Sequence, residues 1–294
     1  MRITNQMLHD RALANLSRNV EALARIQEQV ATSRRLGRPS DDPTDVRSAV
    51  KLSDVKAELE QYQRNIVNAS RTMATAEAAL GSAGEVMQRA RELAIQGANG
   101  SLSPADRTLI AQEIEQLTGQ LVALAGTKAG DQYVFAGFQT ATAPYAPAPA
   151  GTAVVGPYLG DSGALKARIG PGAQVSINVT ADIVFGPAFV ALAQLHGELV
   201  GGGPASPTSI TLVDAGQAAL ISGRSLIGAR QNRFDQTAVT LGDALLAATR
   251  VLSEIVDVDL TEAITELSQR EAVYQASLAV NGRLLQISLI DQLR

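Results

Sequence analysis

The sequence has no cysteine and no tryptophan, and aromatic residues make up only 3% of its 294 residues. Without cysteine, the protein forms neither disulfide bonds nor thiolate metal sites. With so few aromatic residues, its core must be built from alanine, leucine, valine and isoleucine, a composition typical of helical bundles. The missing cysteines fit a secreted protein without disulfides, and they fit a cytosolic protein equally well.

The sequence also lacks a strong charge of either sign and long apolar runs. Its formal net charge is −4 at pH 7, so it has no basic excess with which to neutralise the phosphates of a nucleic acid. No uninterrupted apolar run is long enough to span a bilayer. Residues 1–6 (MRITNQ) lack the apolar segment of a Sec-type signal peptide. We therefore expect no nucleic acid and no membrane as a partner.

Residues suited to catalysis are equally scarce. His9 and His196 are the two histidines, and no nucleophile–base pair stands out. Residues 160–163 (GDSG) match the sequence around the nucleophile of trypsin-like proteases, but we interpret them as a turn before a strand. Residues 201–203 (GGG) lack the lysine and helix start of a phosphate loop, so we interpret them as a linker. We expect no enzyme and no cofactor.

Acidic residues gather at two places where a helix is expected to begin. They are Asp41, Asp42, Asp45, Asp257 and Asp259. Such a set suits either a cation site or the capping of helix N-termini. Capping explains nearly all of them, so we predict no metal site.

The clearest pattern is an apolar heptad repeat with alternating spacings of three and four. Its positions are Leu52, Val55, Leu59, Tyr62, Ile66, Ala69, Met73, Ala76, Leu80, Ala83, Met87, Ala90 and Ala94. This spacing predicts a helix that packs lengthwise against other helices. No proline lies between Pro43 and Gly97, so the helix is expected to run unbroken. Its bulky positions form a rod seam of Leu52, Leu59, Ile66, Met73, Leu80 and Met87.

A first helix is expected over about residues 5–35. Its seam is Leu13, Leu16, Val20, Leu23, Gln27 and Val30. A break follows, in which Gly37 is expected to close the helix in the left-handed conformation and Pro39 prevents its continuation. Asp42 is then expected as the N-cap of the long helix, with Pro43 at its first position.

The composition changes between about residues 131 and 208, which hold eight of the eleven prolines and only six charged residues. Before this segment, a capped helix is expected from about 103 to 126. Within the segment, residues 133–135 are predicted to form a strand, and residues 165–180 a hairpin around Gly-Pro-Gly. Residues 189–200 are predicted to form a short helix. The segment is therefore expected to be a small β-rich insert.

Helical periodicity returns after Pro207. The seam there is Leu220, Ile227, Phe234, Ala238, Leu241, Leu245, Ala248, Leu252 and Ile255, with Arg224 and Gln231 as polar members. A second break lies at 257–259, where Asp259 is expected to cap the last helix. That helix has two apolar faces, so we expect it to contact more than one neighbour. One face holds Leu260, Ile264, Leu267, Tyr274, Leu278 and Leu285, and the other Val273, Ala276, Val280, Leu284 and Ile287.

Together these patterns predict a mainly α fold, in which both chain ends form a long antiparallel helical bundle or coiled coil that carries a small β-rich inserted domain. The expected domains are a terminal coiled coil of 1–43 and 258–294, a helical rod of 44–130 and 209–257, and the insert of 131–208. Antiparallel folding brings the breaks at 36–44 and 257–259 side by side. The charges of the two ends also favour this pairing. Residues 1–40 carry seven arginines and three acidic residues, whereas residues 209–294 carry ten acidic residues and seven arginines.

Several short motifs are more specific. Residues 38–43 are RPSDDP and residues 227–233 are IGARQNR. Residues 1–4 are MRIT, 97–100 GANG, 133–137 YVFAG and 288–291 SLID. The first two resemble elements common to the flagellin superfamily, and the other four resemble its branch at the junction between hook and filament. The resemblance covers about 1–140 and 209–294, and residues 141–208 carry no motif that we can match.

This resemblance implies a structural protein of the bacterial flagellum that self-assembles into a tubular ring layer. The terminal helices would form the inner coiled-coil layer, the rod the next layer, and the insert would face outward. The implied partners are further copies, the hook-side junction protein, flagellin and a flagellar export chaperone. The protein would be extracellular, exported through the flagellar apparatus without a Sec signal. The expected assembly interface is Leu13, Leu16, Val20, Leu23, Leu278, Val280, Leu284, Leu285 and Ile287.

Two alternatives differ from this interpretation. A filament-forming flagellin would polymerise alone at high concentration, which a junction protein should not do. A secreted coiled-coil adaptor would need neither the terminal motifs nor a tubular assembly.

Overall fold

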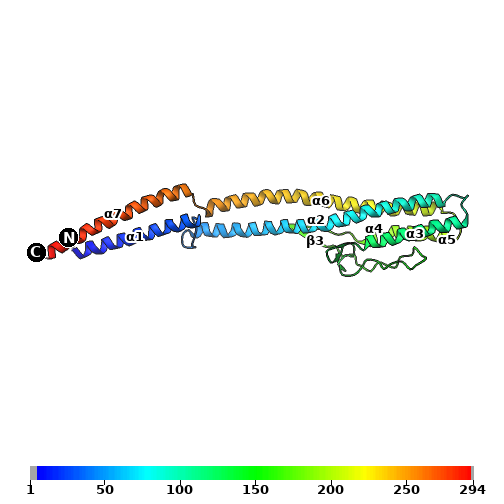
Figure 1. The fold of residues 1–294 in the computed structure, drawn as a ribbon, viewed down its shortest axis with the longest axis horizontal. Helices are drawn as coiled ribbons and strands as arrows, with labels where there is room; N and C mark the ends of the chain where they lie inside the picture. Colours follow the sequence, from blue (N-terminus) through cyan, green and yellow to red (C-terminus); the bar gives the residue numbers. More distant parts are fainter. Residues whose placement is uncertain (1–4, 293–294) are drawn as a thin grey trace. The chain divides into compact units, whose positions relative to one another are not determined.

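The computed structural model describes the backbone of residues 5–292 and the side chains of residue 7 and residues 10–282. Its helices (Figure 1) are α1 (Asn5–Thr32), α2 (Pro43–Gly97), α3 (Pro104–Ala125), α4 (Ala181–Val184), α5 (Gly186–Val200), α6 (Pro207–Val256) and α7 (Leu260–Gln292). Its strands are β1 (Lys128–Ala129), β2 (Gln132–Tyr133), β3 (Lys166–Gly170) and β4 (Ala173–Ser176). The mainly α fold predicted from the sequence is confirmed.

The long helices begin where the sequence places capping residues. The Asp42 carboxylate accepts hydrogen bonds from the N–H groups of Thr44 and Asp45, at 2.9 and 3.0 Å, at the start of α2. Ser103 and Asp106 form a reciprocal capping box at the start of α3. At α7, the Asp259 carboxylate accepts from the N–H of Thr261 at 2.8 Å. Short side chains with an acceptor oxygen thus set these starting points.

The end of α1 differs from the prediction. The residue in the left-handed conformation is Ser33, with φ of 56°, and Gly37 does not have a positive φ. The helix therefore stops at Thr32, several residues before the glycine. The carbonyl of Ser33 accepts a hydrogen bond from the N–H of Val258 at 3.2 Å. This contact with a distant segment, which local sequence does not reveal, accompanies the left-handed turn at a non-glycine residue.

Contacts divide the chain into two compact units. The terminal unit consists of Met1–Glu58 and Ala244–Arg294, and the central unit of Leu59–Asp243. Helices α2 and α6 contribute to both units. The three-domain division expected from the sequence stays a prediction about how the chain folds.

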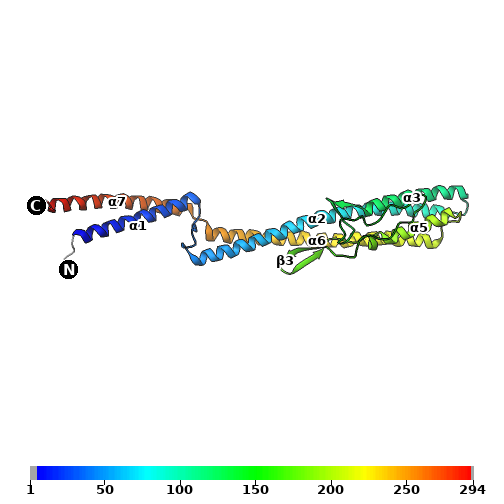
Figure 2. The same cartoon turned by 90° about the horizontal axis from the view of Figure 1, so that it is seen from below.

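The central unit is built around the seam of α2. From Tyr62 to Ala94, every heptad position is buried, and Met73, Leu80 and Met87 are fully inaccessible to solvent. On α6, buried residues recur every seven positions at Val213, Leu220, Ile227, Phe234 and Leu241. Helices α3 and α5 pack together in the same unit (Figure 2). Truncation of one such leucine to alanine costs about 2–5 kcal/mol, because the cavity collapses only partly.

The insert contains less strand than the sequence suggests. The predicted hairpin is present as the antiparallel pair β3–β4, with Gly172 at φ of 71° in its turn. Residues 134–137, however, form turns rather than a strand. The rings of Phe135, Phe185, Phe189, Tyr145 and Tyr158 form a chain of contacts with centroids 4.8–6.3 Å apart. This aromatic cluster gives the insert a core that does not depend on a larger sheet.

The loop at residues 160–163 holds the YVFAG segment. One carboxylate oxygen of Asp161 accepts from the N–H groups of Phe138 and Gly163 at 2.7 and 2.8 Å. The hydroxyl of Tyr158 donates to the carbonyl of Phe135 at 2.9 Å. Gly137 has φ of 68°, and a Cβ there would overlap Asp161. The segment that resembles a protease nucleophile site is thus an irregular loop with a bend at Gly160, in which Asp161 accepts backbone hydrogen bonds.

Candidate assembly surfaces and the paired helix breaks

The two helix breaks lie side by side within the terminal unit, as the sequence predicts. Arg34 and Asp257 form an isolated antiparallel bridge. The N–H of Arg35 donates to the carbonyl of Val256 at 2.7 Å. Together with the bond from Val258 to Ser33, these contacts join the end of α1 to the segment between α6 and α7. Carbonyl groups at the ends of α1 and α6 are thus satisfied across the two breaks.

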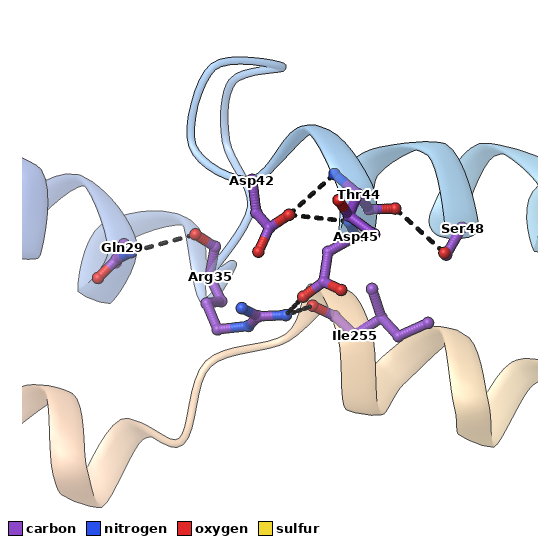
Figure 3. Close-up of polar contacts among 7 residues, drawn as sticks. All are labelled: Gln29, Arg35, Asp42, Thr44, Asp45, Ser48 and Ile255. Carbon is purple, nitrogen blue, oxygen red and sulfur yellow. Dashed lines mark hydrogen bonds and ion pairs between the residues drawn. The ribbon is translucent and has the colours of Figure 1, made fainter.

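Arg35 adds a side-chain connection between three helices (Figure 3). Its guanidinium donates to the Asp45 carboxylate near the start of α2 and, at 2.7 Å, to the carbonyl of Ile255 near the end of α6. The amide of Gln29 in α1 donates to the carbonyl of Arg35 at 3.1 Å. A cation at the last turn of α6 is favoured by the helix dipole. We call Arg35, Asp45 and Ile255 the break clamp.

The electrostatics of the break centre on Asp42. The backbone N–H groups of Asp45 and Thr44 hydrogen-bond to its charged form, and this lowers the pKa of Asp42 below its usual 3.8. Arg35 lowers it further by charge attraction. The carboxylate therefore stays ionised at neutral pH, the form that caps α2.

The α1–α7 pair uses only part of the predicted α1 seam. Asn19 donates to the Ser277 hydroxyl of α7 at 2.9 Å, and Ile26 is buried with 8% of its surface exposed. Leu16 and Leu23 are half-buried, whereas Leu13 and Val20 are 51% and 44% exposed. The contact face therefore runs through Asn19 and Ile26, and a second apolar face is left outside. Sequence reasoning missed Ile26, although its seven-residue spacing from Asn19 and Ala12 is visible in the sequence.

Helix α7 also exposes apolar side chains. Leu278 is 43% exposed and Val280 is 57% exposed. Leu284, Leu285 and Ile287 belong to the backbone of α7, but their side chains lie outside the described residues. In the terminal unit, Leu52 and Leu245 of the predicted rod seam are half-buried, as is Leu59 at the edge of the central unit. The remaining residues of the predicted rod seam lie in the central unit and are buried. They are Ile66, Met73, Leu80, Met87, Ile227, Phe234 and Leu241.

Within the described residues, no group of three or more His, Asp and Glu side chains is arranged to hold a metal ion. None of the helices in this part of the chain is long and apolar enough to cross a membrane.

Comparisons with known proteins match both ends of the chain. A model of the bacterial flagellin N-terminal helical region matches residues 3–140, and a model of the bacterial flagellin C-terminal helical region matches residues 210–293. Flagellar hook-associated protein 3 of Escherichia coli is 26% identical over 94% of this chain and 95% of its own length. The flagellar filament 30.7 kDa core protein of Treponema maltophilum is 25% identical over 86% of this chain and 85% of its own length.

The fold also matches a solved structure. The crystal structure of flagellar hook associated protein-3 from Legionella pneumophila aligns with a TM-score of 0.62 and 17% identity. The alignment covers 69% of this chain and 98% of that chain. At this level of identity, the likeness concerns the fold.

Proposed function

Because this chain belongs to the bacterial flagellin family, we propose that it is a structural protein that forms the junction between the flagellar hook and the filament. The observation that carries the proposal is the end-to-end similarity to hook-associated protein 3, over 94% of this chain and 95% of that protein. The motifs at 97–100 and 133–137 point to the same branch. The relatives are structural flagellar proteins, and we propose that this chain likewise has no catalytic activity.

The exposed apolar faces of the terminal unit support self-assembly. Leu13 and Val20 on α1, and Val280 on α7, lie at the surface of a single chain although they are large and apolar. Large apolar side chains exposed along a helix face are typical of an interface. We propose that neighbouring subunits cover these faces in a tubular layer. The interface would also include Leu16, Leu23, Leu278, Leu284, Leu285 and Ile287.

We propose that the layer contacts the hook-side junction protein on one side and flagellin on the other. Before export, an exposed amphipathic α7 would be prone to aggregation, so a cytoplasmic export chaperone would bind it as a helix in a groove. Export through the flagellar apparatus would then place the protein outside the cell.

Immuno-labelling of isolated flagella tests the proposed function. A junction protein gives a narrow labelled band between hook and filament. Labelling along the whole shaft would instead support a filament-forming flagellin, and the similarity to a filament core protein makes this the second candidate. If flagella carry no label, the secreted coiled-coil adaptor would be the remaining alternative.

A further inference from the structure

A groove with a volume of about 500 Å³ lies at the paired breaks of the terminal unit. It runs between the first turns of α2 and the last turns of α6. Its larger apolar side chains are Leu36, Val46, Val50, Leu252 and Val256, and the charged side chains that line it are Arg34, Arg38 and Asp257. Val50 is 57% exposed, so the apolar surface is open to a partner. The groove thus combines apolar side chains with two cationic ones and one carboxylate, that of Asp257, which accepts a hydrogen bond from the hydroxyl of Ser253 in its own segment.

The two arginines have capacity for further partners. Among the residues that the structure describes, no carboxylate pairs with Arg34. Arg38 pairs with Glu28 at 3.1 Å, but its side chain is 68% exposed. An ion pair that exposed contributes little and exchanges partners readily. A ligand of this groove should therefore carry apolar side chains flanked by carboxylates.

The chain itself carries such a surface. On α6, Asp235, Val239, Asp243 and Leu246 follow one another at spacings of four, four and three, which places them on one face of the helix. We call these four residues the α6 stripe. Val239 is 67% exposed and Leu246 is 61% exposed. Neither aspartate forms an ion pair or hydrogen bond within the described part of the chain.

One chain cannot place its own stripe in its own groove. Thr249, Leu252 and Val256 of the same helix α6 line the groove, starting within one turn of Leu246. A straight helix cannot fold back on itself over that distance. The complementary occupant is therefore the stripe of a second copy. When the groove of one copy takes the stripe of a second copy, and its own stripe enters a third, the contact is head-to-tail, the kind that builds rings or helical tubes.

We propose that, in the tubular layer, each copy inserts Val239 and Leu246 of its α6 stripe into the groove of the next copy. Asp235 and Asp243 then pair with Arg34 and Arg38 of that copy. This inference rests on the proposed function, because it assigns an interface within the same assembly. It adds a contact outside the α1 and α7 faces.

Disulfide cross-linking tests the contact without interference, because the natural sequence has no cysteine. The full-length double variant Val50→Cys with Val239→Cys is assembled into flagella and oxidised. Each chain then carries one cysteine on each surface, so a ladder of linked copies is expected. A mixture of the two single variants should stop at linked dimers, since each chain offers only one surface. The control pairs Val50→Cys with Leu226→Cys, which is exposed on another side of α6 and should give no ladder.

Charge exchange provides an independent measurement. Arg34→Glu with Arg38→Glu should abolish the cross-link, and so should Asp235→Arg with Asp243→Arg, because like charges then face each other. Chains that carry all four changes should regain it, since the pairs are reversed rather than removed. A merely structural role of these residues would not produce such a recovery. Thermal unfolding checks that each variant remains folded.

The outcomes separate this inference from the proposed function. A labelled band at the junction without the ladder, or with a ladder equal to the control, overturns the inference and leaves the function standing. A link from the groove cysteine to flagellin or to the hook-side protein also overturns it. If the chain is absent from flagella, the function fails. The same cross-link is then measured on concentrated purified chains, where its absence overturns the contact and its presence supports it.

Discussion

At the scale of single residues, one motif of this chain connects segments that are distant in sequence. Arg230, within the IGARQNR motif, donates to the carbonyl of Asn178 at 2.8 Å. The amide of Asn178 in turn donates to the carbonyl of Gly163, in the loop that holds YVFAG. The IGARQNR motif of α6 is therefore linked to the insert through Asn178.

The break clamp predicts the effect of one substitution. Arg35→Ala should lower the free energy of unfolding of the terminal unit by about 1 kcal/mol, because the partly exposed pair with Asp45 is weak and the bond to Ile255 adds to it. Chemical denaturation measures the change. Arg47→Ala is the control, since Arg47 is exposed and its guanidinium donates to the carbonyl of Pro43 in its own helix. Equal effects of the two variants would mean that the clamp contributes nothing.

Asp42 predicts a dependence on pH. Its pKa is lower in the folded chain than in the unfolded chain, so its contribution to stability is complete above the unfolded value of 3.8. That contribution is lost as the pH falls through the lowered folded value. Asp42→Asn keeps a capping oxygen but does not titrate, so it should lose less stability between pH 6 and about pH 3. Identical pH profiles in thermal unfolding would contradict this cause.

A comparison of alanine substitutions at Gly137 and Gly130 distinguishes the cost of backbone strain from the cost of steric overlap. Gly137→Ala should destabilise the insert more than Gly130→Ala does. Both glycines have positive φ, 68° and 64°, but only at Gly137 would the new methyl group overlap Asp161. The left-handed strain costs about 1–2 kcal/mol at either position, and displacement of Asp161 adds to it at Gly137. Equal losses in calorimetry would show that Asp161 moves freely.

At the scale of elements, heptad spacing predicts burial where one helix faces a single partner layer. The seam of α2 from Tyr62 to Ala94 is of this kind, and every position is buried. In α1 the spacing is ambiguous, because Leu13 and Val20 form one face and Asn19 and Ile26 another. The partner helix selects the second face, and no local pattern encodes that choice. The turn around Gly137 could not be predicted from local sequence either, since it depends on contact with Asp161.

The seam of α2 gives a prediction at this scale. Leu80→Asp should unfold much of the central unit, because a buried carboxylate without a partner costs several kcal/mol. Leu109→Asp, at a position 63% exposed on α3, should leave the melting temperature nearly unchanged. Circular dichroism on heating compares the two. A similar loss in both variants would mean that the burial of Leu80 does not govern the stability of α2.

At the scale of the whole molecule, the central and terminal units differ in how they bury apolar side chains. The central unit encloses its seam within one chain. In the described part of the terminal unit, Ile26, Ala248 and Ala263 are the buried apolar residues, and several larger ones are exposed. A single chain therefore buries the apolar seam of the central unit, whereas the terminal unit keeps exposed apolar surface that partners can cover. This division suits a subunit that is stable alone and binds others through its ends.

The exposed face of α7 gives the prediction that separates these two roles. Val280→Asp should weaken both chaperone binding and junction assembly, because a carboxylate would enter an apolar interface. The melting temperature of the purified chain should stay the same, since Val280 is 57% exposed within it. Gln275→Asp is the control, because it adds the same charge at an exposed polar position of α7. A lower melting temperature with unchanged chaperone pull-down would mean that this face packs within the chain, and calorimetry and pull-down on the same samples decide between the two.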